Sequence, residues 1–337
     1  MTRRPQPAEH PVPRRALLLG AAGALIGAAG CSRSAGAAAP RHDAGRASAP
    51  RPATSSAPAS ALPPTTPWTP SAAEVEPRAK SRAVAVVEAI GAWPRGAGGA
   101  AAARSRVAAL HQSTRLVAQA GPLLPAADAA ALQVVYAQYG GILADSASVL
   151  VVCRQWTRHG GTVRAGGTTV DVRLERTPAG WTVTALHPAQ PGPPLAKPAP
   201  DARAVLADPA IVLPPAARAD VLAGRVHTGV LTALLRLART YRMYVSVVRS
   251  GHPLYVFGTR RPSDHPRGRA FDVWQIDGHA VVDPGTPRAL VERFMRDAAA
   301  AGSYNVGGPV VLTGGNRPGQ FFSDATHHDH VHAGFRT

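Results

Sequence analysis

The sequence predicts an α+β protein with two folded regions, a small one over residues 72–187 and a larger one over residues 201–337. In the small region, segments with helical periodicity come first, and short alternating segments typical of strands follow. In the larger region, helical and strand segments are interleaved, which favours a helix-backed antiparallel sheet. A proline-rich stretch over residues 188–200 separates the two regions and is typical of a semi-rigid linker.

Residues 1–31 are typical of an export signal. Arg14-Arg15 is followed by a mildly apolar run that is too short to span a membrane. The twin arginine is typical of a Tat-type address, and Ala28-Ala29-Gly30-Cys31 resembles a lipobox, after whose cleavage Cys31 carries lipid. Plain secretion without lipidation is the alternative. Either way we expect an exported protein, and a lipidated Cys31 would anchor it to the outer face of the cytoplasmic membrane, within the cell wall.

Residues 32–71 contain little more than Ala, Pro, Ser, Thr and Arg, a composition that predicts a disordered tether. The chain has two cysteines, Cys31 and Cys153, so no disulfide framework is expected. Cys153 closes an apolar run, and we expect it to be a small buried residue.

The small region begins with a predicted helix, since Ala83, Val86, Val87 and Ile90 share one helical face, and Ala-rich segments extend the helical pattern through Tyr139. Three strands are expected at residues 148–152, 169–174 and 181–186, joined by Gly-containing turns as an antiparallel meander. This order of helices and strands resembles cystatin/NTF2-like domains. The region shows no catalytic constellation, so a docking or spacer role is expected.

The larger region begins with an amphipathic stripe that predicts a helix packed on the core: Val230, Leu231, Leu234, Leu235 and Ala238. A strand over residues 243–248 follows, and Asp277-Gly278 predicts a hairpin turn. Thr286-Pro287 has the cap-then-proline order of a helix start, and Gly302 should end that helix.

Two short stretches of the larger region carry potential metal ligands. In the first, His265 and Asp272 stand on either side of Gly268, and Pro266 disfavours a helix, so we expect a loop that runs into a strand at Ala270. Gly268 permits the turn that brings His265 back to Asp272.

The second stretch runs from His327 to His332. His330 and His332 are two residues apart and therefore share one face of a predicted strand, with Val331 toward the core. Asp329 should face away from the metal if this strand is regular. His327 and His328 precede the strand. Two histidines and one aspartate are ligands that Zn²⁺ accepts, and three protein ligands leave a fourth position for water.

These stretches also carry a family resemblance. Ser263-x-His265-x-x-Gly268-x-Ala270-x-Asp272 matches the signature of the zinc D-Ala-D-Ala peptidases, the peptidase M15 family. His330-x-His332 is similar to the second motif of the wider set that joins them to lysostaphin-type endopeptidases and hedgehog domains. The resemblance covers roughly the last 140 residues, a normal domain size. It implies one Zn²⁺ held by His265, Asp272 and His332, with His330 as catalytic base or transition-state stabiliser.

The sequence departs from the family in one place. Family members carry an arginine after a Ser-Gly turn, where it holds the substrate carboxylate, but here His252 follows Ser250-Gly251. We expect Ser263 and two nearby arginines, Arg249 and Arg261, to contact the substrate. Both a carboxypeptidase and an endopeptidase therefore remain open.

Together these features predict an exported zinc metallopeptidase that hydrolyses peptide bonds in peptidoglycan stem peptides. The alternative is a non-catalytic lipoprotein that contains zinc and binds the cell wall. An iron oxygenase with a two-His-one-carboxylate triad is disfavoured, because such sites usually place the first His and the carboxylate two residues apart and here they are seven apart. The formal charge of +17 fits anionic wall polymers and lipid head groups; no nucleic-acid module is present, and no nucleic-acid partner is expected.

Overall fold

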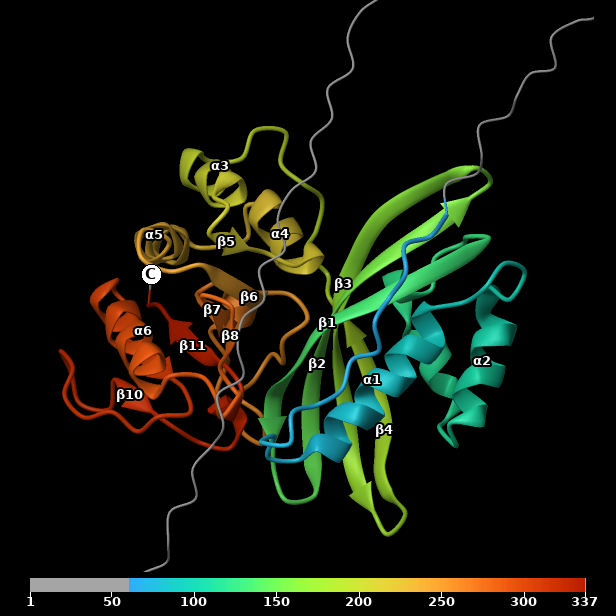
Figure 1. Cartoon of the computed structure of the whole chain (residues 1–337), viewed down its shortest axis with the longest axis horizontal. Coiled ribbons are helices and arrows are strands. Elements are labelled where there is room, and N and C mark those ends of the chain that lie inside the picture. Colours follow the sequence, from blue (N-terminus) through green and yellow to red (C-terminus); the bar gives the residue numbers. More distant parts are fainter. Residues whose placement is uncertain (1–60, 337) are drawn as a thin grey trace, which may run out of the picture. The chain divides into compact units, whose positions relative to one another are not determined.

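The computed structural model describes residues 61–336 as an α+β fold with one antiparallel sheet and one mixed, mainly antiparallel sheet (Figure 1). The predicted export signal with Arg14-Arg15, the lipidation site Cys31 and the tether up to residue 60 lie outside the described residues. Within residues 61–336, no helix is long and apolar enough to cross a membrane. These residues belong to one compact unit that contains two hydrophobic cores.

The first core lies between a four-stranded antiparallel sheet and the helices on one of its faces (Figure 1). The strands, in sheet order, are β1 (Ala129–Ile142), β2 (Ser146–His159), β3 (Thr162–Thr177) and β4 (Gly180–Pro188). The helices are α1 (Pro77–Gly91) and α2 (Gly99–Ala109), followed by the 3-10 turns η1 (Thr114–Gln119) and η2 (Gly121–Leu123). The predicted apolar face of α1 is buried, the predicted meander is present, and Cys153 is buried in this core.

The helical pattern expected through Tyr139 is wrong over its last part, where residues 129–142 form the long strand β1. An alanine run opens this segment, and alanine favours helices. Beyond it, Val134, Val135 and Tyr136 favour a strand, and pairing with β2 along its whole length outweighs the local propensity.

The end of the predicted tether belongs to the folded region. The Thr66 N–H donates to Gln133 Oε1 (2.7 Å), and Gln133 Nε2 donates to Thr66 O (2.8 Å). Trp68 packs edge-on against the Tyr136 ring, with 6.5 Å between centroids. The composition of this segment, rich in proline and threonine, predicted disorder. The segment is nevertheless ordered, and its one tryptophan, Trp68, provides the aromatic contact with the sheet.

The second core lies around a mixed sheet with the order β10-β9-β11-β7-β6-β5, in which β8 pairs with β7. The central pairs are antiparallel, while the edge pairs β5–β6 and β9–β10 are parallel. The strands are β5 (Ile211–Val212), β6 (Met243–Val247), β7 (Ala270–Ile276), β8 (His279–Ala280), β9 (Asn305–Gly307), β10 (Phe321–Phe322) and β11 (Val331–Gly334). The helices are α3 (Pro200–Ala207), α4 (Pro215–Leu222), α5 (Thr228–Leu237) and α6 (Arg288–Ala300), with 3-10 turns η3 (His265–Arg267) and η4 (Thr326–His328).

Most local expectations for this region are confirmed. The predicted stripe lies on α5, the predicted strand is β6, and Asp277 and Gly278 turn the β7–β8 hairpin with positive φ values of 52° and 85°. The start of α6 differs, because the Thr286 hydroxyl donates to Ala280 O (2.5 Å) instead of capping the helix. Gly302 follows the last turn of α6 with a φ of 109°.

The two regions pack directly on each other. Tyr136 of β1 stacks on Trp274 of β7 at 4.6 Å between ring centroids. The proline-rich segment after β4 therefore connects two regions in contact, and the expected spacer role does not describe their arrangement.

Candidate metal centre

The first motif places its two ligands from a tight turn and a central strand. His265 opens the 3-10 turn η3, where a loop was expected, and Pro266 fits the start of such a turn. Gly268 ends it in the left-handed conformation (φ 69°), and a Cβ there would lie 2.0 Å from Arg225 O. The chain then enters β7, which carries Asp272 to the middle of the sheet.

The second motif reaches the same place through strand register. His332 on β11 is the direct antiparallel partner of Asp272 on β7. Directly opposed residues in such a pair point to the same face. Val331, one residue earlier, points into the core as expected.

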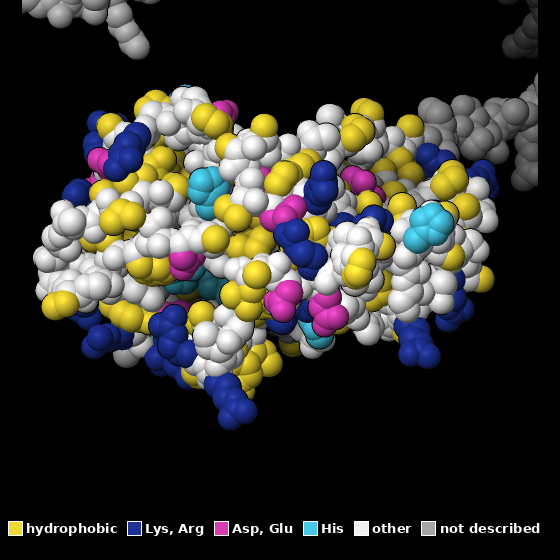
Figure 2. All heavy atoms as spheres, turned by 90° about the horizontal axis from the view of Figure 1, so that it is seen from below, with side chains coloured by type: hydrophobic (Ala, Val, Ile, Leu, Met, Phe, Trp, Pro, Cys, Tyr) yellow, Lys and Arg dark blue, Asp and Glu magenta, His cyan; other side chains and the backbone are white. Residues whose placement is uncertain are grey.

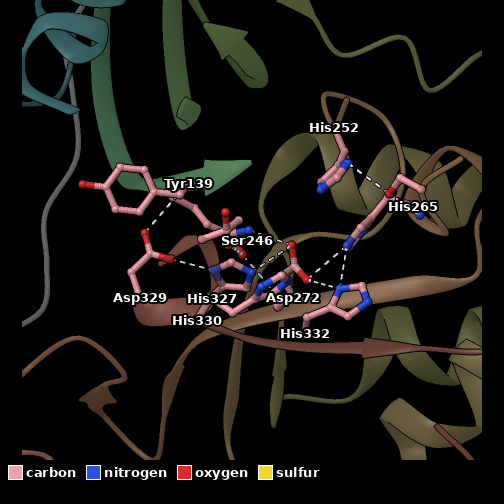
Figure 3. A network of polar contacts seen from close by, with 12 residues as sticks. Tyr139, Ser246, His252, His265, Asp272, His327, Asp329, His330 and His332 are labelled. Carbon is pink, nitrogen blue, oxygen red and sulfur yellow. Dashed lines mark hydrogen bonds and ion pairs between the residues drawn. The ribbon is translucent and has the colours of Figure 1, made fainter. Parts of the chain in front are cut away.

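Three donor atoms of these residues converge (Figure 3). His265 Nε2 lies 3.1 Å from Asp272 Oδ1 and 3.1 Å from His332 Nδ1, and His332 Nδ1 lies 3.0 Å from Asp272 Oδ1. Tetrahedral zinc with ligand bonds of about 2.0–2.1 Å requires ligand atoms about 3.3 Å apart. The donor set and its spacing therefore fit a zinc ion with only a small expansion.

Hydrogen bonds outside this triangle orient His265 and Asp272, and burial keeps His332 neutral. His265 Nδ1 lies 2.9 Å from Val248 O, so its N–H points there and Nε2 presents a lone pair. Asp272 turns Oδ1 to the triangle, while Oδ2 accepts from Gln138 Nε2 at 2.6 Å. Burial lowers the pKa of His332 to about 4, against the opposing effect of Asp272, so its imidazole is neutral at pH 7.

Asp272 is ionised in this environment. Burial raises the pKa of its carboxyl, but its interactions with His265, His330 and His332 lower it more, to well below its usual range. The cluster thus combines an anionic carboxylate with imidazole lone pairs, the donor chemistry that Zn²⁺ prefers.

His330 lies beside the triangle, just before β11 begins. Its Nδ1 is 2.6 Å from Asp329 Oδ1 and its Nε2 is 3.8 Å from Asp272 Oδ2. Because Nδ1–H donates to Asp329, Nε2 faces the centre. Burial lowers the pKa of His330, but the negative charges of Asp272 and Asp329 together raise it above its usual value.

Asp329 was expected to face away from the metal on a regular strand. It precedes β11, which starts only at Val331, and its carboxylate is turned away from the donor triangle, toward Lys80 and the Tyr139 N–H. Its fully buried carboxylate receives hydrogen bonds from Lys80 Nζ (2.5 Å), the Tyr139 N–H (3.0 Å) and His330. Burial raises the pKa of Asp329, but Lys80 and His330 lower it by more than that, so the net shift of this pKa is downward.

The centre lines a cavity of about 900 Å³ that both regions enclose. Figure 2 shows histidine side chains at the back of a hollow on one face of the molecule. Of the expected substrate contacts, Ser263 and Arg261 line this cavity. Arg249 does not: it lines a neighbouring cavity of about 740 Å³, and its guanidinium lies 3.3 Å from buried Asp220.

His252, which follows Ser250-Gly251, is an unexpected neighbour of the centre. Its ring stacks on His265 at 4.1 Å, and donor atoms of His252, His265 and Asp272 lie within 4.8 Å of one another. These three residues are a second possible metal-binding set. The triangle with His332 has separations of 3.0–3.1 Å, close to the edge of a tetrahedral zinc site. The sequence signal for His252 was only its place after the Ser-Gly turn.

His327 also lines this cavity, although no role was predicted for it. Its ring lies 5.1 Å from His330 and 5.6 Å from His332. Its Nδ1 lies 2.7 Å from Asp324 Oδ1. Burial raises the pKa of Asp324, but its contacts with His327 lower it to about 2, so the pair is held together by an ionised carboxylate.

Comparison with known proteins adds little to this geometry. No protein-family profile matches the chain, and no curated protein matches it. One solved structure does: an NTF2-like protein with a cystatin-like fold from Novosphingobium aromaticivorans, at 22% identity. The match covers 38% of this chain and 79% of the other, with a TM-score of 0.18, which is too low to establish a shared fold.

Proposed function

We propose that this protein is a zinc-dependent peptidase that hydrolyses peptide bonds in peptidoglycan stem peptides. The observation that carries the proposal is the triangle of His265 Nε2, Asp272 Oδ1 and His332 Nδ1, with 3.0–3.1 Å separations, beside His330 in an open cavity. Three converging protein donors with space for a fourth ligand are typical of catalytic zinc sites.

A zinc ion bound there would polarise a scissile carbonyl and lower the pKa of a water molecule toward about 7. His330 is placed to take the proton of that water, because its Nδ1–H is committed to Asp329 and its Nε2 faces the centre. The same Nε2 can then return the proton to the leaving amine. Asp329 keeps the ring in this tautomer, as a buried carboxylate does for a catalytic histidine in other hydrolases.

The cavity suits a substrate with a carboxylate. Arg261, Arg317 and Arg336 line it, and none of them forms an ion pair within residues 61–336. Guanidinium groups bind carboxylates in bidentate fashion. We infer that they hold a carboxylate of the stem peptide in place of the family's missing arginine. A terminal carboxylate would make the enzyme a carboxypeptidase, and an internal one an endopeptidase.

The cellular setting is part of the same proposal. The export signal and lipidated Cys31 would place the enzyme at the outer face of the cytoplasmic membrane, beside its wall substrate, and the net charge of +17 favours anionic wall polymers. For residues 61–188 we propose a cystatin/NTF2-like fold, supported by the four-stranded meander with helices on one face.

One observation favours the alternative of a non-catalytic wall-binding lipoprotein. If His252 supplies a fourth protein ligand with His265, Asp272 and His332, the coordination is closed, as in structural zinc sites. Zinc would then hold the fold together without giving a water molecule access.

Mass spectrometry of a defined muropeptide pool, incubated with the full chain plus zinc or plus chelator, tests the proposal. Chelator-sensitive loss of a terminal alanine would show a carboxypeptidase, and a chelator-sensitive internal cut would show an endopeptidase. An unchanged pool, with one zinc bound per chain, would overturn the proposal in favour of the binding lipoprotein.

A further inference from the structure

We propose that the N-terminal region, residues 61–188, is a working part of the metal centre, in which Gln138 positions Asp272 and Lys80 positions His330 through Asp329. The roles in hydrolysis rest on the proposed function. The contacts themselves are independent of it, and so are three of the readouts below: zinc affinity, the Co²⁺ spectrum and an NMR signal.

Gln138 reaches the centre from β1 and is fully buried. Its Nε2 donates to Asp272 Oδ2 at 2.6 Å, and its Oε1 accepts from the Ser246 hydroxyl. Both ends of the amide are thus engaged, so the NH₂ group can only face the carboxylate. The carboxylate is thereby held with Oδ1 toward His265 and His332.

Lys80 reaches the other side of the centre from α1. It is fully buried, and its Nζ lies 2.5 Å from Asp329 Oδ2 and 2.6 Å from Glu74 Oε2. The ammonium group also lies over the Tyr139 ring, 4.3 Å from its centroid. The other oxygen of Asp329 binds His330 Nδ1 at 2.6 Å (Figure 3). The chain of contacts therefore runs from Lys80 to the imidazole that faces the cavity.

A spacer domain has no need of these contacts. A buried ammonium or amide group costs free energy unless it is paired, and each of these side chains has a partner in the other region, 249 residues further along the chain for Lys80 and 134 for Gln138. The partners are one member of the donor triangle and the residue that fixes His330. Two buried polar side chains of the N-terminal region thus hold residues of the centre in position.

The test for Gln138 measures metal directly. In the full chain, Gln138→Leu should lower zinc affinity about 10–100-fold and shift the visible spectrum of the Co²⁺-substituted protein. Gln155→Leu is the matched control, since Gln155 is a buried glutamine of the same sheet that binds Gly91 O and Leu123 O. The control should lose stability and keep wild-type zinc affinity and spectrum. Wild-type affinity and spectrum in folded Gln138→Leu would overturn the assignment.

The test for Lys80 separates positioning from folding. Lys80→Met should bind one zinc with unchanged KM and a kcat about 10–100-fold lower, and the downfield NMR signal of the His330 Nδ1 proton should move or vanish. Lys197→Met, which removes the exposed lysine of the linker, should change none of these. If Lys80→Met does not fold, Asp329→Asn probes the same contact with conserved shape and should give the same kcat loss and NMR change.

A folded, zinc-loaded Lys80→Met protein with wild-type kcat and an unmoved proton signal would overturn the role of Lys80. If the wild-type protein hydrolyses nothing, the proposed function fails, but the zinc affinity, the Co²⁺ spectrum and the NMR signal still decide whether the N-terminal region shapes the centre.

Discussion

The two regions contribute to the centre in different ways. The C-terminal region supplies every atom of the donor triangle, from residues that lie on one turn and two paired strands. The N-terminal region supplies none of them, but it provides Gln138 and Lys80, which hold Asp272 and Asp329. The residues that would bind the metal and the residues that orient them therefore lie in different regions of this molecule.

The largest difference should appear when a donor is removed. Asp272→Ala should lower zinc affinity by more than about 100-fold, which is the upper end expected for the loss of an outer partner such as Gln138. Zinc content after dialysis and competition with a chelating dye measure this. Asp220→Ala is a suitable control, because Asp220 is a buried aspartate of the same region, paired with Arg249, and its loss should leave zinc binding intact. Stoichiometric, tightly held zinc in Asp272→Ala would show that other residues form the centre.

The next largest effect should come from His330. His330→Ala should keep one zinc and lower kcat about 10²–10⁴-fold, because the group that faces the reacting water is gone while all three donors remain. This loss should exceed that of Lys80→Met, which leaves the imidazole present but less well oriented. Steady-state kinetics on one muropeptide, with zinc content measured in parallel, rank the two. Equal rates for His330→Ala and wild type would remove His330 from the mechanism.

The donors could be predicted from the sequence, but Gln138 and Lys80, which reach the centre from the other region, could not. His265 and Asp272 are close in the chain, and residue alternation alone places His330 and His332 on one side. The partners that link Lys80 and Gln138 to the centre, Asp329 and Asp272, lie more than 100 residues away in the chain, so no local pattern connects them. The helical expectation for residues 129–139 also concealed that Gln138 is on a strand.

One signal for Lys80 was nevertheless present. Lys80 is spaced three, four and seven residues before Ala83, Val84 and Val87, so it occupies the apolar stripe of α1. A charged residue in such a stripe needs a buried partner. The sequence could therefore have predicted a buried ion pair here, although not that Asp329 completes it.

A smaller effect should distinguish an open centre from a closed one. His252→Ala should keep zinc within about tenfold of wild-type affinity, the low end expected for an outer partner, because His265, Asp272 and His332 already form the donor triangle without it. Isothermal titration with Zn²⁺ measures the change. A drop as large as that of Asp272→Ala would make His252 a ligand and favour the non-catalytic alternative.

The smallest effect concerns the far end of the N-terminal network. Lys80 lies between two carboxylates, Glu74 and Asp329, and Asp329 also binds His330, so Glu74 is the carboxylate left without full compensation. Burial raises the pKa of Glu74 from 4.5 to about 7, with Lys80 opposing the rise. The folded protein therefore keeps a proton on Glu74 that the unfolded chain releases near pH 4.5.

The sign of the pH dependence follows from this proton. Glu74 stabilises the fold most below pH 4.5, and its contribution falls as the pH rises toward 7, with a limiting slope of about 1.4 kcal/mol per pH unit. Glu74→Gln removes this titration while Lys80, Asp329 and His330 remain, so its free energy of unfolding relative to wild type should increase between pH 5 and pH 7. Urea unfolding at intervals across that range measures the difference. A constant difference would show that Glu74 is ionised in the fold and that Lys80 compensates both carboxylates.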